Sequence, residues 1–286
     1  MKRLIAHGQT WWIRAFVVAV LVLVFVDNPW WMIAIPLVLF ALSLVRAPWD
    51  RERAPVEVDV PVRGRWVALN GPGTKVPSHG MIAYGQAFAI DILHPSGATE
   101  PKKFGWRLAS RRADTYPSFA SPVFAAADGT VVAAQNRQRD HRDRGSWPAL
   151  IYLFVVEAFI RELGGAPFIL GNHVIIEHGD GVFSAYAHLR RGSVRVRPGE
   201  HVMAGDHIGD VGNSGNTTEP HLHFQLMDDR HLTGAAGVPF RWRGVEIRSG
   251  DTDVTYATGP VSEELKPGLP ADGQVFTARE PDRVTR

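Results

Sequence analysis

The chain of 286 residues carries 31 Lys and Arg against 29 Asp and Glu, with 12 histidines and no cysteine. This near balance of charge gives no electrostatic reason to expect a nucleic-acid partner, and the missing thiols exclude disulfides, thiolate metal ligands and a cysteine nucleophile. Any metal must therefore be held by His, Asp or Glu side chains, which are typical ligands of hydrolytic zinc sites with an open position.

Two apolar runs open the chain, residues 15–26 without a polar group and residues 30–45 after the break at Asp27-Asn28-Pro29. Each run is short for a spanning helix, which needs about 20 apolar residues, but the tryptophan pairs near them are typical of membrane boundaries. We predict a transmembrane helical hairpin within residues 1–53 that turns at the break and contacts membrane lipid. One long tilted helix, a cleaved signal peptide and a buried soluble hairpin are the alternatives.

Short β-type runs dominate the rest of the chain. Residues 54–77 are predicted to form a linker or leading strand, because valines alternate with polar residues from Val56 to Val62. Residues 78–250 are predicted to form a mainly β domain built on an antiparallel sheet, because glycine-rich turns separate the runs and no long amphipathic helix alternates with them. The runs lie at 66–69, 88–93, 122–134, 173–177, 182–187, 201–211 and 221–227.

Residues 147–163 break this β pattern. Ser146 can serve as the N-cap, Pro148 suits a first helical turn, and Gly164-Gly165 provides a stop. We predict one inserted helix here, within an insertion at about 137–170. Apolar side chains cover nearly its whole circumference, so it should pack against its own domain, touch the membrane or bind a protein partner.

Two polar segments are predicted to be loose. The run Arg137–Arg144 mixes both signs of charge and is predicted to be a solvated loop. Residues 251–286 are polar and rich in Gly, Pro and Glu, which is typical of a flexible C-terminal tail.

The most informative motif is the run Pro220-His221-Leu222-His223-Phe224. In a β-strand, residues two apart point to the same face. His221 and His223 should therefore project side by side, while Leu222 and Phe224 turn into a core. Two neutral imidazoles on one face suit a zinc ion or a metal-bound water; a solvated or hydrogen-bonded pair is the structural alternative.

Further motifs stand upstream in a fixed order: Tyr186-Ala-His-Leu189, Val196-x-Pro-Gly-x-x-Val-x-x-Gly-x-x-Ile-Gly209 and Gly212-Asn-Ser-Gly-Asn216. With the His-x-His motif they resemble the lysostaphin/LytM-type zinc metallopeptidases, the M23 family, over most of residues 79–230. The resemblance implies a LytM-like duplicated-hybrid-motif sandwich, here with the inserted helix and the N-terminal hairpin added.

The resemblance also implies a zinc site. The family takes a His and an Asp from one strand and the second His of the His-x-His pair, and Asp91 and His223 match two of these positions. Three protein ligands leave a fourth position for water, whose pKa zinc can lower to about 7. His188 and His221 match the family's two non-ligand histidines, of which one can move a proton and the other stabilise an oxyanion.

The first zinc ligand of the family is missing from its usual place. That His normally lies four residues before the Asp, where this chain has Ala87. We select His79 as the substitute, because its Gly/Pro-rich loop could fold back over the strand of Asp91. His94, which would face away from Asp91 in an unbroken strand, and His173 are the other candidates.

Three functions follow as hypotheses. The first is a membrane-anchored zinc metalloendopeptidase that hydrolyses peptide bonds of peptidoglycan. The second is a degenerate, non-catalytic LytM-like module that binds cell wall or regulates a partner hydrolase, and Ala87 is the reason to consider it. The third is a lipoyl- or biotinyl-like carrier, which is disfavoured because no lysine lies in residues 182–230.

The predicted location is the cell membrane, with the catalytic domain on the extracytoplasmic side, where the family's substrate lies. The charges flanking the hairpin argue the other way, because the positive-inside tendency would place both flanks in the cytoplasm. These flanking residues are Lys2, Arg3 and Arg14 before the hairpin and Arg46, Arg51 and Arg53 after it.

Overall fold

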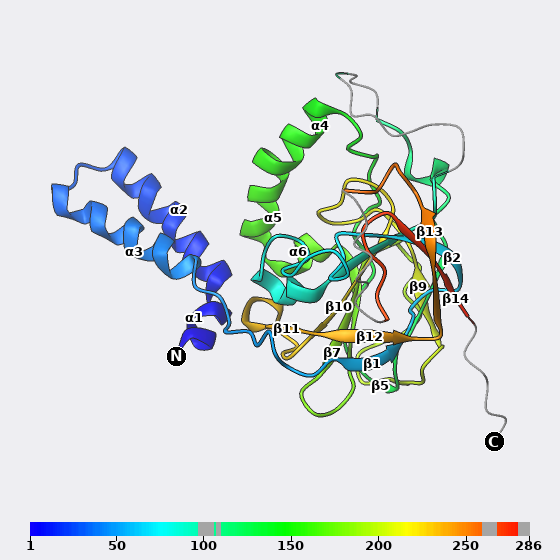
Figure 1. Cartoon of the computed structure of the whole chain (residues 1–286). Coiled ribbons are helices and arrows are strands. Elements are labelled where there is room, and N and C mark those ends of the chain that lie inside the picture. The colour runs from blue at the N-terminus through cyan, green and yellow to red at the C-terminus, as the bar shows by residue number, and fades with distance from the viewer. Residues whose placement is uncertain (97–105, 107–109, 259–267, 280–286) are drawn as a thin grey trace.

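A computed structural model of the chain describes residues 1–96, 106, 110–258 and 268–279. A helical hairpin at the N-terminus projects from a β domain (Figure 1). The helices are α1 Lys2–His7, α2 Gln9–Phe25, α3 Ala34–Ser43, α4 Trp147–Tyr152, α5 Ala158–Gly164 and α6 Ala166–Leu170, with a π-helical segment Leu153–Glu157 between α4 and α5 and short 3-10 turns at Trp30–Ile33, Ala83–Phe88, Ala113–Thr115 and Leu232–Gly234.

The β domain is built on one large antiparallel sheet. Its strands follow the order β13-β14-β2-β3-β10-β7-β6-β5-β8, and β11 pairs with β10. Two small pairs stand apart, β1 with β12 in parallel and β4 with β9 antiparallel. The predicted mainly β antiparallel architecture is thus confirmed. The strands are β1 Val56–Asp59, β2 Gly64–Leu69, β3 Ile90–Leu93, β4 Pro122–Phe124, β5 Gly129–Gln135, β6 Asn172–Glu177, β7 Phe183–Leu189, β8 His201–Val202, β9 His207–Asp210, β10 Leu222–Met227, β11 Gly237–Val238, β12 Phe240–Arg243, β13 Val245–Thr252 and β14 Gln274–Ala278.

The central strand β10 divides the interior by its two-residue period. Leu222, Phe224 and Leu226 are buried in the main hydrophobic core on one face of the sheet. His223 and Gln225 are buried on the other face, which is the alternation that a β-strand imposes. The strand therefore presents its polar residues toward the side on which the inserted helices lie.

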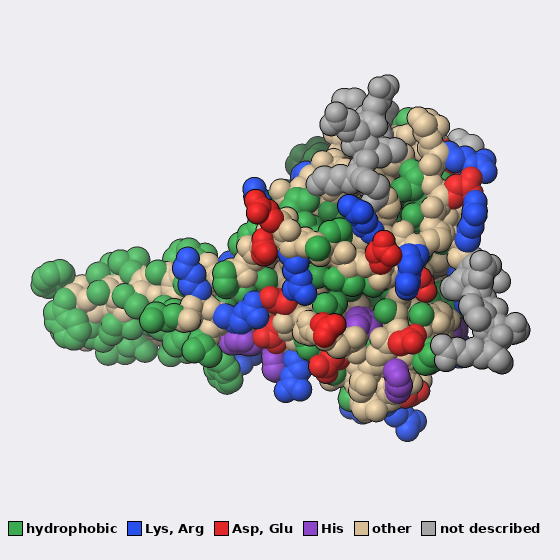
Figure 2. Space-filling view, turned by 60° about the horizontal axis from the view of Figure 1, so that its bottom comes forward, with side chains coloured by type: hydrophobic (Ala, Val, Ile, Leu, Met, Phe, Trp, Pro, Cys, Tyr) green, Lys and Arg blue, Asp and Glu red, His purple; other side chains and the backbone are tan. Residues whose placement is uncertain are grey.

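The N-terminal hairpin forms with its turn at the predicted place, but the transmembrane part of the prediction is not supported. The break after Phe25 and the 3-10 turn at Trp30–Ile33 divide the apolar sequence, leaving α2 with 17 residues and α3 with 10. Within the described ranges, no helix combines enough length with enough apolar character to cross a membrane. Figure 2 shows the projecting hairpin covered mainly by hydrophobic side chains, in contrast to the mixed charges of the β domain.

The inserted helix forms as predicted at both ends. The Ser146 hydroxyl accepts a hydrogen bond from the Ala149 amide, and the chain leaves α5 through Gly165 at a φ of 92°. The helices α4 and α5 lie along the side of the β domain from which the hairpin projects (Figure 1). Packing against the domain covers only part of their surface, because several apolar side chains stay exposed: Ile151, Tyr152, Phe154, Val155, Phe159 and Ile160.

The predicted C-terminal tail contains a strand of the main sheet. β14 lies between β13 and β2, and Phe276 of β14 is 1% exposed in the main core. Val275 and Phe276 of Gln274–Ala278 are adjacent and do not alternate with polar residues, and the short run with its polar surroundings gave no strand signal in the sequence. Residues 259–267 and 280–286 of the predicted tail lie outside the described residues.

Candidate functional site

Adjacent strands bring Asp91 and His223 together. β3 and β10 pair antiparallel with Asp91 opposite His223, so both side chains leave the same face of the sheet. The His223 Nδ1 atom lies 2.9 Å from Asp91 Oδ1. Both side chains are buried, with 9% of the Asp91 side chain and 4% of the His223 side chain exposed.

A loop delivers His79 to the same carboxylate. Ser78 pairs with the segment before β3, since its amide donates to the Ala87 carbonyl (3.0 Å) and its hydroxyl to the Gln86 carbonyl (3.1 Å). This places His79 Nε2 at 3.1 Å from Asp91 Oδ2. A loop imidazole thus lies beside Asp91, although position 87 itself is Ala. His79, Asp91 and His223, the strand cluster, each offer one ligand atom, and these atoms lie within 4.8 Å of one another.

The other two candidates for the third imidazole lie elsewhere. His94 stacks on Trp66 with ring centroids 3.9 Å apart, and its Nε2 lies 3.1 Å from Ser121 Oγ. His173 is buried with its Nδ1 2.8 Å from the Gly171 carbonyl. Neither contacts Asp91 among the interactions of the described residues.

Gln225 sets the protonation of His223. The Gln225 side-chain amide donates to the Tyr84 carbonyl (2.8 Å), so its Oε1 is the atom that faces His223 Nε2 at 2.9 Å. An amide oxygen only accepts, and His223 Nε2 must therefore carry the proton. In the neutral ring, the His223 Nδ1 atom then carries no proton where it faces Asp91 Oδ1. Two neighbouring acceptor atoms of this kind can bind one cation.

A bulge turns His188 toward this cluster. Tyr186 and Leu189 both pack in the main core, so the simple alternation of β7 is broken between them. His188 has a φ of 62°, which is unusual for a residue with a side chain. Its Nδ1 lies 2.8 Å from the Ser214 carbonyl, and its ring centroid is 4.8 Å from that of His221 and 5.8 Å from that of His223.

His221 completes the group from the start of β10. Its Nδ1 is 2.8 Å from the Glu219 carbonyl and 3.0 Å from Thr217 Oγ1, and its Nε2 is 3.5 Å from Asp91 Oδ1. The carbonyl requires Nδ1 to carry a proton. The five side chains selected from the sequence therefore lie together, although their roles as ligands or catalysts stay predictions.

Burial and charge act in opposite directions on these groups. Burial is the largest influence on Asp91 and would raise its pKa, but the charges of His79 and His221 and the hydrogen bond with His221 act the other way, and this pKa lies well below its usual value. Burial lowers the pKa of His188 well below its usual value, helped by the nearby charges of His221 and His223. Burial also lowers the pKa of His223 against the attraction of Asp91. The arrangement thus favours an ionised Asp91 and disfavours the charged forms of His188 and His223.

The cluster opens into a cavity of about 590 Å³. Sheet residues, including Asp91, His188 and His221, form one wall, and the inserted helix contributes Phe154 and Glu162 to the other. The inserted helix therefore shapes the space in which a substrate would meet the histidines. A cavity of this size suits a peptide segment of a few residues.

The charged segment Arg137–Arg144 is a loop with exposed Arg137, Arg139 and Arg142, as predicted, but its last two residues are not solvated. Asp143 and Arg144 are buried, and Arg144 binds both carboxylate oxygens of Glu157 at 2.7 and 2.6 Å. Asn213 donates to the His141 carbonyl at 2.7 Å, which joins the segment to the turn that precedes the histidine strand. Partners distant in sequence satisfy these charges, and the local pattern contained no signal of them.

The sequence did not reveal three residues whose hydrogen bonds support the strand cluster. Gln225 and Tyr84 act as described above, and Asn70 donates to Asp91 Oδ2 at 2.9 Å. Gln225 follows His223 at the spacing of one strand face, which is a signal that could have found it. Asn70 and Tyr84 lie in irregular segments with positive φ values of 50° and 60°, and no periodicity places such residues.

The Peptidase family M23 model matches residues 155–234, a range that includes His188, His221 and His223 but not His79 or Asp91. The chain is 42% identical over 107 residues to the peptidoglycan DD-endopeptidase ShyA of Vibrio cholerae serotype O1, covering 37% of this chain and 17% of that protein. It is 38% identical over 134 residues to the glycyl-glycine endopeptidase ALE-1 of Staphylococcus capitis, covering 46% and 35%. The chain thus spans about a third or less of these relatives.

Among solved structures, the catalytic domain of lysostaphin from Staphylococcus simulans aligns with 61% of this chain and 88% of that one. The sequence identity is 20% and the TM-score is 0.32.

Proposed function

We propose that this chain, which carries a Peptidase family M23 domain with lysostaphin-type homologues, is a zinc metalloendopeptidase that hydrolyses peptide bonds of peptidoglycan. The observation that carries the proposal is the strand cluster beside two further buried histidines, at the wall of a cavity of about 590 Å³. Two imidazoles and a carboxylate are a ligand set of catalytic zinc.

The zinc ligands in this proposal are His79, Asp91 and His223. The bare Nδ1 that Gln225 enforces on His223 supports the assignment, because a metal ligand must be deprotonated. Zinc bound there would polarise the scissile carbonyl and lower the pKa of a water ligand to about 7.

His188 and His221 divide the proton chemistry. The His188 Nδ1–H donates to the Ser214 carbonyl, so the Nε2 of the neutral ring is free to accept a proton from the attacking water. His221 donates from Nδ1 to the Glu219 carbonyl, and its Nε2 lies near the Asp91 carboxylate, which suits a protonated nitrogen. We therefore assign His188 as the base and His221 as the donor to the charge developing on the carbonyl oxygen.

We also propose that the hairpin holds the protein at the cell membrane, with the catalytic domain on the extracytoplasmic side. Its exposed apolar side chains, among them Phe25 at 79% and Trp30 at 87%, support contact with lipid. We propose the same membrane for the exposed face of the inserted helix; the hydrogen bond from Arg14 of α2 to the Leu163 carbonyl of α5, which joins the two helical regions, supports this. A protein partner for that face is the competing assignment.

Hydrolysis is tested with the purified full chain in detergent, assayed on cell-wall material. We expect cleavage that is lost on chelation, restored by zinc, and lost in His79→Ala together with the metal of the strand cluster. His94→Ala is the matched control, since His94 is a nearby histidine that stacks on Trp66, and it should keep both metal and cleavage. A zinc-loaded chain that cleaves nothing would support the alternative, a non-catalytic LytM-like module that binds cell wall or regulates a partner hydrolase.

A further inference from the structure

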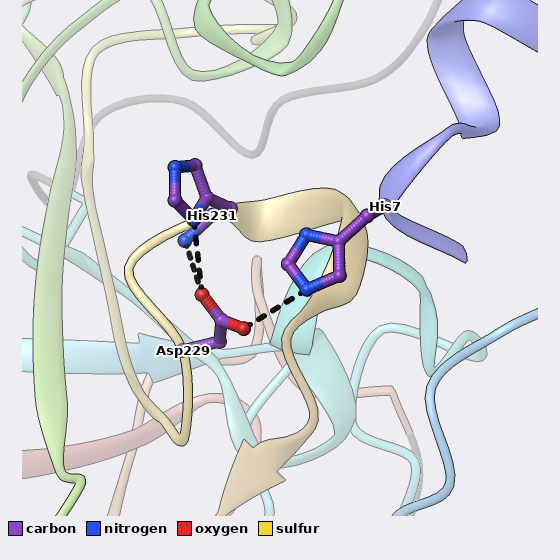
Figure 3. Close-up of side chains that lie close together, drawn as sticks. All are labelled: His7, Asp229 and His231. Carbon is purple, nitrogen blue, oxygen red and sulfur yellow. Dashed lines mark hydrogen bonds and ion pairs between the residues drawn. The ribbon is translucent and has the colours of Figure 1, made fainter. Parts of the chain in front are cut away.

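A second cluster of ligand side chains lies where the N-terminal helix meets the β domain. His7 ends α1, while Asp229 and His231 belong to the loop after β10. One ligand atom from each of the three lies within 4.8 Å of the others. Figure 3 shows the Asp229 carboxylate between the two imidazoles, which come from segments more than 200 residues apart in sequence.

We propose that His7, Asp229 and His231, the N-terminal cluster, bind a divalent cation of the zinc class and thereby fasten α1 to the β domain. Two imidazole nitrogens and a carboxylate suit Zn²⁺. The site is independent of the strand cluster, and the proposal does not require the chain to be a peptidase.

The distances within the N-terminal cluster are compatible with a shared cation. His7 Nε2 lies 3.2 Å from Asp229 Oδ2, and His231 Nδ1 lies 3.3 Å from Asp229 Oδ1. These lengths are at or beyond the long end of N–H···O hydrogen bonds, and each is near the separation of about 3.3 Å between two ligands of a tetrahedral zinc with bonds of about 2.0–2.1 Å. Because the imidazoles face different oxygens, a shared ion requires Asp229 to bind through both oxygens or to turn one toward both rings.

The surroundings hold each ligand in place. The His231 amide donates to Asp229 Oδ1 at 2.9 Å, which fixes the carboxylate. Arg3 forms its ion pair with Asp228 at 2.5 Å and leaves Asp229 to the imidazoles. Side-chain exposures of 33% for His7 and 59% for His231 allow water to complete the coordination.

Gly234 provides the space for the His7 ring. A Cβ atom at position 234 would lie 2.3 Å from His7 Cε1 and 2.4 Å from His7 Nε2, far inside contact distance. The Thr233 hydroxyl also donates to the His7 carbonyl at 3.3 Å. The loop thus receives this imidazole in a cradle that only glycine leaves open.

Zinc titration of the full chain, stripped with a chelator and held in detergent, tests the proposal by the number of equivalents bound. We expect two equivalents, falling to one in His7→Asn and in His231→Asn, with the lost site weakened more than about 100-fold. His201→Asn is the control, a surface histidine of β8 whose Nδ1 faces the Gly129 carbonyl, and it should keep both.

The result that would overturn the proposal is an equal count in the wild type, His7→Asn and His231→Asn, which would mean hydrogen bonds alone. The active-site proposal is tested separately by His79→Ala. If only the strand cluster fails to bind, the wild type holds one equivalent, His7→Asn holds none, and His79→Ala still holds one.

Discussion

The strand cluster and the N-terminal cluster each consist of two histidines and one aspartate, but their surroundings differ. In the strand cluster the carboxylate is 9% exposed and lies within 3.5 Å of three imidazoles. In the N-terminal cluster it is 19% exposed and contacts two. The buried cluster opens into a substrate-sized cavity and has further histidines beside it, whereas the exposed one joins two segments of the chain.

A ligand set alone therefore does not define a function. Zinc catalysis needs an open coordination position within a shielded cavity and groups that move protons nearby. The strand cluster has His188, His221 and the cavity wall of the inserted helix. The N-terminal cluster is open to solvent and includes the last residue of α1, and we expect a metal bound there to stabilise the attachment of α1 to the β domain.

The largest expected effect separates the two aspartates. Asp91→Asn should remove zinc from the strand cluster and reduce wall hydrolysis roughly 10³-fold or more, because a metal supplies several kcal/mol to such a reaction. The same change at Asp229 should instead remove the other equivalent and leave zinc at the strand cluster. Metal analysis of the two variants beside an activity assay checks this, and loss of the same equivalent in both would break the comparison.

Burial itself can be tested at His141, a histidine of neither cluster. Burial and the Arg144 charge lower its pKa from 6.5 to about 4, so the unfolded chain binds this proton more readily than the folded one between these values. Above pH 6.5 the imidazole is neutral in both states, and this group does not change the free energy of unfolding. As the pH falls toward 4, the unfolded state gains the proton first and the free energy of unfolding decreases, by at most about 3 kcal/mol.

The measurement for His141 is denaturant unfolding at pH 7 and pH 4.5. The decrease in unfolding free energy should be smaller in His141→Gln than in the wild type, since glutamine can still donate to the Gly215 carbonyl that His141 Nε2 contacts at 2.7 Å but does not titrate. Taking the difference between the two proteins removes the contributions of the other buried histidines. Equal decreases would assign the pH effect elsewhere.

A smaller effect is expected behind the strand cluster. Gln225→Leu keeps the approximate volume but removes the oxygen that holds the proton on His223 Nε2, so zinc affinity should fall about 10- to 100-fold, as for other supporting residues of metal sites. Competition with a chelator of known affinity measures it. The N-terminal cluster of the same variant is the internal control, and its affinity should not change; an unaltered strand cluster would refute the role of Gln225.

Much of the fold was accessible from the sequence because its signals are local. The alternation around His221 and His223 placed both the core face and the site face of β10, and Ser146 and Gly165 marked the ends of the inserted helix. β14 was missed, since its five residues are recognisable as a strand only by pairing with β2.

The site followed the same rule. The β3–β10 register brings Asp91 to His223, and the resemblance supplied both, but the position of His79 depends on Ser78 pairing across Ala87. No sequence motif contains His7, Asp229 and His231. Asp229 and His231 are two residues apart, but His7 lies more than 200 residues before them, and the three form a cluster only after folding.

The smallest expected effect tests the cradle of the N-terminal cluster. Gly234→Ala places a methyl group on the His7 ring, so the ring must shift and zinc should bind there about tenfold more weakly, in keeping with the angular precision that metal ligands require. In the His7→Ala background the ring and this zinc site are both gone, and the same Gly234→Ala change should leave the free energy of unfolding unchanged. Zinc titration of Gly234→Ala and denaturant unfolding of His7→Ala with and without Gly234→Ala measure the two effects. A loss of stability on adding Gly234→Ala to His7→Ala would mean that alanine disturbs the loop itself, and that the space at Gly234 is not reserved for His7.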